Sequence, residues 1–245
     1  MASGWKYLLS ACILLLIWHV LAEVIASSFF PPPAVAFFTF FEELFFGNLA
    51  HHFLKTGLRM MYGLLMALLA GVPLGLACRE EKFDDYMGPI IYITYSIPHI
   101  SLLPVIILLF GIGDLSKVFL VALIVFFKIL VTTRDAAKNV DEHLIYSVLS
   151  LGATKRQIYT KVIFPTCLPE IMTALRISIG TSIAVLFFAE SFATTEGLGY
   201  VILDSWGRSS YEEMFGGIIG MALLGSFAYI TIDFLEKKIC KWKFL

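Results

Sequence analysis

The chain has 245 residues, of which 59% are hydrophobic and 15% are charged. A soluble domain of this length could not bury so much apolar surface, so we expect the lipid bilayer to be its solvent. The net charge of −1 at pH 7 provides no broad basic field, which argues against nucleic acid as a partner.

Long uncharged runs predict about six transmembrane helices. A helix that crosses roughly 30 Å of hydrocarbon needs about 20 apolar residues, and runs near that length recur along the chain. They are residues 7–22, 60–78, 86–113, 118–127 with an extension to 133, 177–189 and 214–232. The chain is therefore predicted to be an all-α, multi-pass protein of the cytoplasmic (inner) membrane, surrounded by lipid, with residues 1–245 forming one domain.

The distribution of cations predicts the orientation. Placing the N-terminus inside puts twelve of the eighteen Lys and Arg residues on the cytoplasmic side, around residues 79–82, 134–138, 155–161 and 237–243. Lys and Arg in short loops stay in the cytoplasm. Both termini are therefore expected there.

Three prolines at residues 31–33 should end the first span, because proline lacks a backbone donor and favours an extended chain. The next segment, residues 34–46, is rich in phenylalanine and carries two adjacent glutamates. Two interpretations are open for it: a helix lying in the outer membrane interface, or a loop packed on neighbouring spans.

Small residues at helical spacing predict close helix packing in two spans. In the second span they recur every four residues, and in the last span they form two similar pairs, so another helix can approach each face. These residues are Gly63, Ala67, Gly71 and Gly75 in the second span and Gly216, Gly217, Gly220 and Gly225 in the last.

The third run, residues 86–113, exceeds a straight crossing and contains three prolines. A broken or strongly tilted element is expected, which membrane proteins tolerate where it faces protein or a water-filled cavity. Ser96, Pro98 and His99 are therefore candidate translocation-pathway residues. His99 could instead be a structural, hydrogen-bonded histidine, which is the favoured alternative.

Glu190 is an acidic residue close to the predicted outer end of the fifth span. It is also a candidate pathway residue, since ionisable groups in spans are costly and often functional. Two alternatives are that it binds a donor group or holds residues 196–199 against another helix, and the structural role is favoured.

Residues 139–165 form a polar cytoplasmic segment with its own helix signals. Asn139 and Glu142 have the spacing of a capping box, and so do Thr154 and Gln157. Gly152 between them can end a helix in the left-handed conformation. Two short helices are predicted to meet at a glycine corner, the second stopping before Pro165. Because a plain connection between spans needs only a few residues, a docking role is favoured over an ordinary loop.

This segment resembles the signature loop of permease subunits of binding-protein-dependent ATP-binding cassette (ABC) importers. That pattern is Glu-Ala-Ala, three residues, Gly, nine residues and Ile-x-Leu-Pro. Gly152 and residues 162–165 (Val-Ile-Phe-Pro) keep its spacing, whereas Tyr146, Ser147 and Val148 replace Glu-Ala-Ala.

The resemblance extends over nearly the whole chain and is strongest to the nitrate, sulfonate and taurine branch. The similar motifs are residues 30–35, 97–98 with 110–113, 189–190 and 196–199. The fold implied is that of a type I ABC importer permease with cytoplasmic termini.

The resemblance implies that the corner is a coupling helix that inserts into a cytoplasmic ABC ATPase subunit. The partners implied are that ATPase, which carries the ATP and Mg, an extracytoplasmic solute-binding protein and a second, identical permease copy. The solute implied is small and anionic or organic, such as nitrate, a sulfonate, taurine or bicarbonate. The coupling residues would be Leu149, Leu151, Gly152, Ala153, Thr154, Lys155 and Pro165.

The chain is not expected to be an enzyme or to bind a cofactor or metal. It has no Gly-x-x-x-x-Gly-Lys-[Ser/Thr] loop for nucleotide phosphates, and its four cysteines are isolated. A membrane-embedded hydrolase using Ser96 and His99 would need an orienting carboxylate nearby, which the sequence does not supply. The main alternative is an ion-gradient-driven secondary transporter, and an ABC exporter half is a further one.

Overall fold

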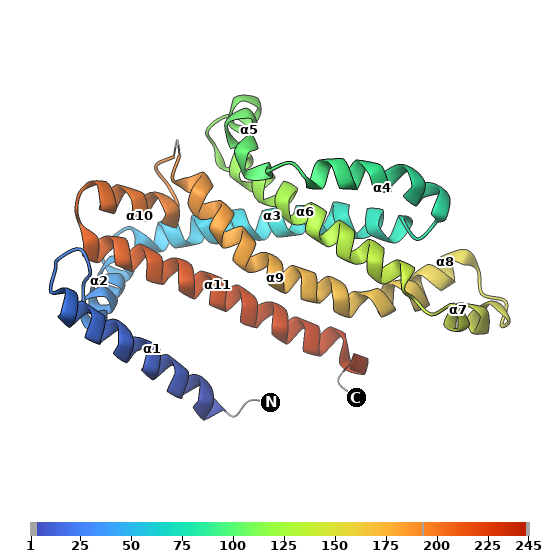
Figure 1. Ribbon diagram of the computed structural model, residues 1–245, viewed down its shortest axis with the longest axis horizontal. Helices are drawn as coiled ribbons and strands as arrows, with labels where there is room; N and C mark the ends of the chain where they lie inside the picture. Colours follow the sequence, from blue (N-terminus) through green and yellow to red (C-terminus); the bar gives the residue numbers. More distant parts are fainter. Residues whose placement is uncertain (1–3, 193, 244–245) are drawn as a thin grey trace. The chain divides into compact units, whose positions relative to one another are not determined.

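The computed structural model describes residues 4–192 and 194–243, and within these ranges it consists of helices without strands (Figure 1). The predicted cytoplasmic ends, residues 1–3 and 244–245, lie outside the described residues. In chain order the elements are α1 (Gly4–Ile25), α2 (Pro33–Phe45), α3 (Leu49–Ala77), α4 (Glu81–Tyr95), the 3-10 helix η1 (His99–Leu102), α5 (Leu103–Phe110), α6 (Asp114–Lys138), α7 (Glu142–Leu149), α8 (Lys155–Ile158), the π-helix η2 (Tyr159–Ile163), α9 (Phe164–Glu190), α10 (Leu198–Gly207), α11 (Tyr211–Ile239) and the 3-10 helix η3 (Lys241–Lys243).

The described helices confirm the prediction of about six spans. Five helical stretches are long and apolar enough to cross a membrane: Leu8–Ile25, Leu49–Ala77, Asp114–Lys138, Lys155–Glu190 and Tyr211–Ile239. The sixth candidate is a broken pair, Glu81–Tyr95 and His99–Phe110, bent by 78°. The break falls at Pro98, so the prediction of a broken third element is also confirmed.

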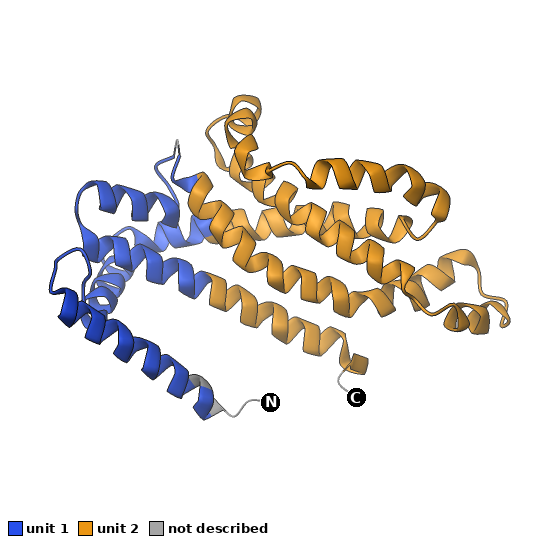
Figure 2. Ribbon diagram, viewed as in Figure 1, with its two compact units in different colours: residues 1–56, 190–224 blue, residues 57–189, 225–245 orange. Residues whose placement is uncertain are grey.

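The chain divides into two compact units, coloured separately in Figure 2. Unit 1 comprises residues 1–56 and 190–224, and unit 2 comprises residues 57–189 and 225–245. The prediction of one permease domain over residues 1–245 stays a prediction.

In unit 2 the small residues of α3 bring this helix close to α6, as predicted. A Cβ atom added at Gly63 would lie 2.6 Å from Val121 Cγ1, and one at Gly75 would lie 2.6 Å from Thr133 Cβ. Side chains larger than hydrogen would therefore force the two helices apart. This contact fixes the second and fourth predicted spans against each other.

In unit 1 the glycines of α11 receive α2 and α10. The Cβ position of Gly216 is 3.6 Å from Phe40 Cα, and that of Gly217 is 2.8 Å from Ile202 Cγ1. Segment 34–46 is a helix, so the alternative of a packed loop is wrong; its place in the membrane interface stays a prediction. Proline is favourable in a first helical turn, where its missing donor costs nothing, so α2 can begin at Pro33.

Candidate functional site

The predicted cytoplasmic segment contains two short helices, α7 and α8, which lie next to each other (Figure 1). The predicted capping box of Asn139 and Glu142 is wrong. Helix α6 runs to Lys138, so Asn139 is its C-cap, and its backbone N–H donates to Asp135 O. Asp141 caps α7 instead, since its Oδ1 accepts the His143 N–H at 2.9 Å.

The glycine corner between the two helices is confirmed. Gly152 has φ +80°, a conformation that disfavours L side chains, and no atom lies within 4 Å of its Cβ position. The second capping box is present as well: the Thr154 N–H donates to Gln157 Oε1 at 2.8 Å, and the Gln157 N–H donates to Thr154 Oγ1 at 3.4 Å. These contacts set the corner from local sequence alone.

The second helix does not stop before Pro165, so that prediction is wrong. The chain continues through the π-helix η2 into α9, and Pro165 is the second residue of α9. The Phe164 N–H donates to Tyr159 O, five residues back. Proline removes a helical hydrogen bond and crowds the carbonyl four residues earlier, at Lys161, and the wider π turn accommodates both effects.

Apolar side chains on the corner divide into a packed set and an exposed set. Val140, Ile145 and Ala153 belong to a cluster that also contains residues of α6 and α9. The other set, which we call the corner patch, is exposed, and its residue Leu151 is 86% exposed. An exposed apolar group on a segment predicted to be in water marks a contact surface. The corner patch consists of Leu144, Tyr146, Leu149 and Leu151.

Tyr146 stands where the resembling family has its glutamate, and sequence reasoning did not include it in the coupling set. Leu144 was not included in that set either. Helical spacing could have indicated Leu144, because residues 144, 148, 149 and 151 follow one side of the turn. The sequence could not tell which of them the rest of the protein covers.

The turn between α3 and α4, residues 78–80, contacts both arms of the corner. The Arg79 guanidinium donates to Ala137 O at the end of α6 and lies 3.8 Å from Glu142 Oε1 of α7. Glu80 Oε1 lies 2.9 Å from Lys155 Nζ of α8 and accepts a 3.2 Å hydrogen bond from the Tyr159 hydroxyl. The pKa of the Glu80 carboxyl is lowered, mainly by the hydrogen bond from Lys155 and next by the hydrogen bond from Tyr159.

Helix α4 is tied to α6 by a third set of ion pairs. Asp84 accepts hydrogen bonds from the Arg134 guanidinium and from the Lys138 ammonium. Sequence reasoning missed Asp84, Arg79 and Glu80 because charge spacing alone does not identify partners 50 or more residues away. The α3–α4 turn and the first helical turn of α4 are thus joined to α6, α7 and α8.

The candidate pathway residues lie at the break between α4 and η1. The Ser96 hydroxyl donates to Tyr92 O at 3.0 Å, and Pro98 precedes η1. The His99 ring lies 4.9 Å from the Phe127 ring, and its Nε2 is buried without a hydrogen-bond partner among the described residues. The favoured alternative, a hydrogen-bonded structural histidine, is therefore wrong for Nε2. The pathway role of these residues stays a prediction.

Glu190 lies in a buried polar cluster of unit 1, which we call the Glu190 clamp. Its side chain is 1% exposed, and its carboxylate accepts hydrogen bonds from the Thr56 hydroxyl at 3.0 and 2.9 Å and from the Gly199 N–H at 3.0 Å. Thr56 Oγ1 in turn accepts the Leu198 N–H at 2.8 Å. Gly197, with φ +114°, passes so close that an added Cβ would lie 2.3 Å from Glu190 Cδ.

These contacts match the alternative in which Glu190 holds residues 196–199 against another helix, here α3. A buried charge is costly unless hydrogen bonds satisfy it, and the clamp supplies them. Outside it, Glu196 lies 2.9 Å from Lys55 Nζ and 3.2 Å from His51 Nε2. The hydrogen bond from Lys55, and then that from His51, lowers the pKa of Glu196.

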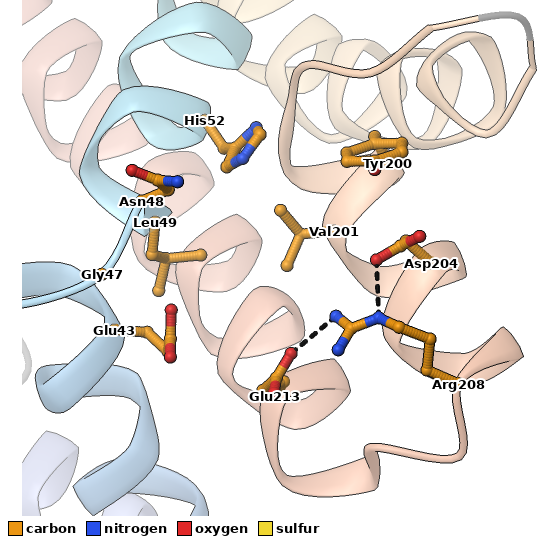
Figure 3. Close-up of a pocket in the computed structure, with 10 residues that line it drawn as sticks. All are labelled: Glu43, Gly47, Asn48, Leu49, His52, Tyr200, Val201, Asp204, Arg208 and Glu213. Carbon is orange, nitrogen blue, oxygen red and sulfur yellow. Dashed lines mark hydrogen bonds and ion pairs between the residues drawn. The ribbon is translucent and has the colours of Figure 1, made fainter.

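A cavity of about 320 Å³ also lies in unit 1, between the start of α3 and helix α10 (Figure 3). Arg208 is held there between Asp204 at 2.9 Å and Glu213 at 2.7 Å, and Glu43 and His52 belong to the other wall. Sequence reasoning did not anticipate this hollow. Among the residues that the structure describes, no group of three or more His, Cys, Asp or Glu side chains is placed to share a metal ion.

Comparison with known proteins defines the class. Residues 63–241 match the family described as the inner membrane component of binding-protein-dependent transport systems. The chain belongs to this family. It is accordingly the non-catalytic, multi-pass subunit of an ABC importer in the inner membrane. This subunit works with an ATPase and a solute-binding protein.

Relatives extend over most of the chain. A Bacillus subtilis (strain 168) protein named as an aliphatic sulfonates transport permease, SsuC, is 31% identical over 98% of this chain and 88% of its own length. The taurine transport system permease protein TauC of Escherichia coli (strain K12) is 30% identical over 80% of this chain and 71% of its own. The comparisons give no support to the ion-gradient-driven alternative or to an exporter half.

The fold is also that of a solved ABC transporter chain. A structure of the MetNI methionine ABC transporter in an inward-facing conformation matches with a TM-score of 0.67 at 20% identity, covering 81% of this chain and 98% of that one. The predicted type I importer permease fold is confirmed.

Proposed function

We propose that residues 139–165 form the surface through which the ATPase drives this permease. The observation that carries the proposal is the corner patch, an apolar surface exposed on a corner whose two helices are both capped. A groove on a partner protein would cover such side chains, as amphipathic helices are covered in helix-in-groove complexes. Residues at or beside this contact are Leu149, Leu151, Gly152, Ala153, Thr154, Lys155 and Pro165.

The α3–α4 turn supplies a route from that surface into the spans. A displacement of α7 would pull on Arg79 through Glu142, and a displacement of α8 would pull on Glu80 through Lys155. The turn continues directly into α4, the first half of the broken span. Motion of the corner would therefore reach the break with Ser96, Pro98 and His99, where alternating access to the pathway is expected.

In the membrane orientation that we propose from the distribution of cations, this corner and both chain ends lie in the cytoplasm. ATP and Mg then belong to the ATPase, and this chain binds no cofactor itself. The delivery protein meets the opposite membrane face. A second, identical permease copy completes the pathway, and Glu190 takes part in it through the segment that it holds.

The solute is proposed to be a small organic sulfonate or a related anion, because relatives at 31% and 30% identity are named for aliphatic sulfonates and taurine. Two cations within the spans are already engaged: Lys128 donates to Thr181 Oγ1 at 2.8 Å, and Arg176 pairs with Asp233 and Glu236. Selection then rests mainly with the external binding protein. Exchanging binding proteins should change which anion is taken up, and unchanged specificity would contradict this part.

The coupling proposal is tested with Leu151→Asp in the assembled importer. A charge in the corner patch should abolish ATPase co-purification and ATP-dependent uptake while membrane insertion continues. Phe46→Asp is the matched control, because Phe46 is 91% exposed on the α2–α3 connection. Normal uptake by the Leu151 variant, or equal loss in both variants, would reject the proposal.

A further inference from the structure

A second hollow, of about 620 Å³, lies in unit 2 where the end of α3 meets the start of α8. Pro73 and Leu76 of α3 and Phe83 of α4 give it an apolar wall. Glu80, Lys155 and Arg156 give it a charged side. We call it the α3–α8 groove.

The two sides of the groove are expected to lie at different depths of a membrane. Pro73 and Leu76 are in the last turns of a helix apolar enough to span the bilayer, Leu49–Ala77. Lys155 and Arg156 open the next long apolar stretch, Lys155–Glu190, at its polar end. In the proposed orientation, the groove would bring its cations to the level of lipid headgroups and its apolar wall to the level of acyl chains.

The charges in the groove favour an anion. Lys155 is partly neutralised by Glu80, 2.9 Å away. Arg156 is exposed and has no ion-pair partner in the part of the chain that the structure describes. A guanidinium with free donors binds phosphate oxygens in a bidentate manner. Basic pockets between helices on the cytoplasmic side are typical sites for anionic headgroups.

We propose that the α3–α8 groove binds an anionic phospholipid of the inner leaflet, with its phosphate at Arg156 and Lys155 and an acyl chain along Pro73, Leu76 and Phe83. This assignment rests on the proposed orientation. A bound phosphate would compete with Glu80 for Lys155. Lipid occupancy would then weaken the Glu80–Lys155 contact between the α3–α4 turn and the corner, so coupling would depend on lipid charge.

The test measures lipid binding to the complete importer, ATPase included, by native mass spectrometry and by spin-labelled lipids in nanodiscs. The probes are phosphatidylglycerol and phosphatidylcholine with the same acyl chains. Phosphatidylglycerol should be retained in preference. Arg156→Gln should weaken its retention about fivefold, the effect of one Arg near a headgroup. Lys238→Gln, which removes an exposed cation of α11, should leave it unchanged.

Three results would overturn the proposal: equal retention of both lipids, equal losses in the two variants, or binding that disappears once the ATPase is present, which would make the ATPase the occupant. Displacement by millimolar inorganic phosphate alone would likewise reduce the site to a simple anion site. A Phe83→Ala variant tests the wall separately and should weaken lipid retention without changing phosphate binding. If lipid binding is as expected while Leu151→Asp leaves uptake intact, the coupling proposal fails and the lipid site stands.

Discussion

At two regions of the molecule the chain turns at a glycine with positive φ, and the surroundings of the two glycines differ. At the corner between α7 and α8, Gly152 has φ +80° and open space around its Cβ position. At the Glu190 clamp, Gly197 has φ +114° and the Glu190 carboxyl group within 2.5 Å of that position. The first glycine is needed for backbone shape alone. The second is needed for shape and for space.

The neighbouring side chains show the same contrast. The corner leaves apolar groups uncovered, and these gain stability only when a partner removes them from water. The clamp buries a carboxylate and satisfies it with donors from its own unit. Under the proposed function, the exposed apolar surface is where this protein would meet another, whereas the closed polar cluster joins parts of its own unit 1.

The largest effect is expected for Gly197→Ala. Strain at this φ alone costs on the order of 1–3 kcal/mol, and the added Cβ would also displace the Glu190 carboxyl group, 2.3 Å from it. The thermal unfolding midpoint of the purified protein should fall steeply and uptake should be lost. Gly152→Ala is the matched control, with strain of about 1–2 kcal/mol and no clash. Equal falls in the unfolding midpoints of the two variants would contradict the proposed difference between Gly152 and Gly197.

Gly152→Pro should come next and should act on coupling. Proline cannot adopt φ +80°, and it would remove the hydrogen bond that the Gly152 N–H donates to Leu149 O at 2.9 Å. The variant should still insert, and its unfolding midpoint should fall less than that of Gly197→Ala, because no side chain lies within 4 Å of the Gly152 Cβ position. ATP-dependent uptake should drop at least about tenfold, the equivalent of ~1.4 kcal/mol in coupling. Uptake at the normal rate would show that the corner geometry does not matter.

Glu190→Gln should lower stability by about 1–3 kcal/mol, because the NH2 of the glutamine side chain is a donor and would face donors that now meet a carboxylate oxygen. Thr56→Val should do the same, and the two effects should be far from additive, since both residues share one network. Glu23→Gln, on an exposed carboxylate of α1, serves as the control. Additive losses would mean that the clamp is not a unit.

The smallest effect on stability is expected for Glu80→Gln, because an exposed ion pair contributes at most about 1 kcal/mol. Its effect on the uptake rate should be larger than its effect on unfolding. Since the pKa of Glu80 is lowered, its contacts are present above the unfolded value of about 4.3 and are lost as pH falls through the folded pKa. The difference from wild type should thus be constant from about pH 6 to 8. A difference that vanished within that range would contradict the assigned ionisation.

Local signals predicted the parts of the site that depend on neighbours in sequence. Gly152 and the Thr154–Gln157 box needed only turn and cap chemistry. The Gly63–Gly75 face needed only helical spacing. The errors arose where elements continue beyond their local signal: α6 extends to Lys138 and makes Asn139 a C-cap, and the π turn lets the chain pass Pro165.

The contacts of Arg79, Glu80 and Asp84 were beyond prediction for a different reason. Their partners lie 50 or more residues away, and several other charged residues near the same predicted membrane face could have been the partners. The unpaired Nε2 of His99 likewise depends on how Phe127 packs against the broken span. Hydrophobic periodicity in the sequence predicts which face of a helix is buried. Which residue of another helix contacts that face depends on the tertiary structure.

Photo-cross-linking from position 151 tests the central claim most directly. A benzoylphenylalanine in place of Leu151, introduced into the assembled importer with its ATPase and binding protein, should give a covalent adduct with the ATPase. The same group in place of Phe46 should give none. Adducts from position 151 that join only residues of the permease, in an assembly that hydrolyses ATP, would contradict the account.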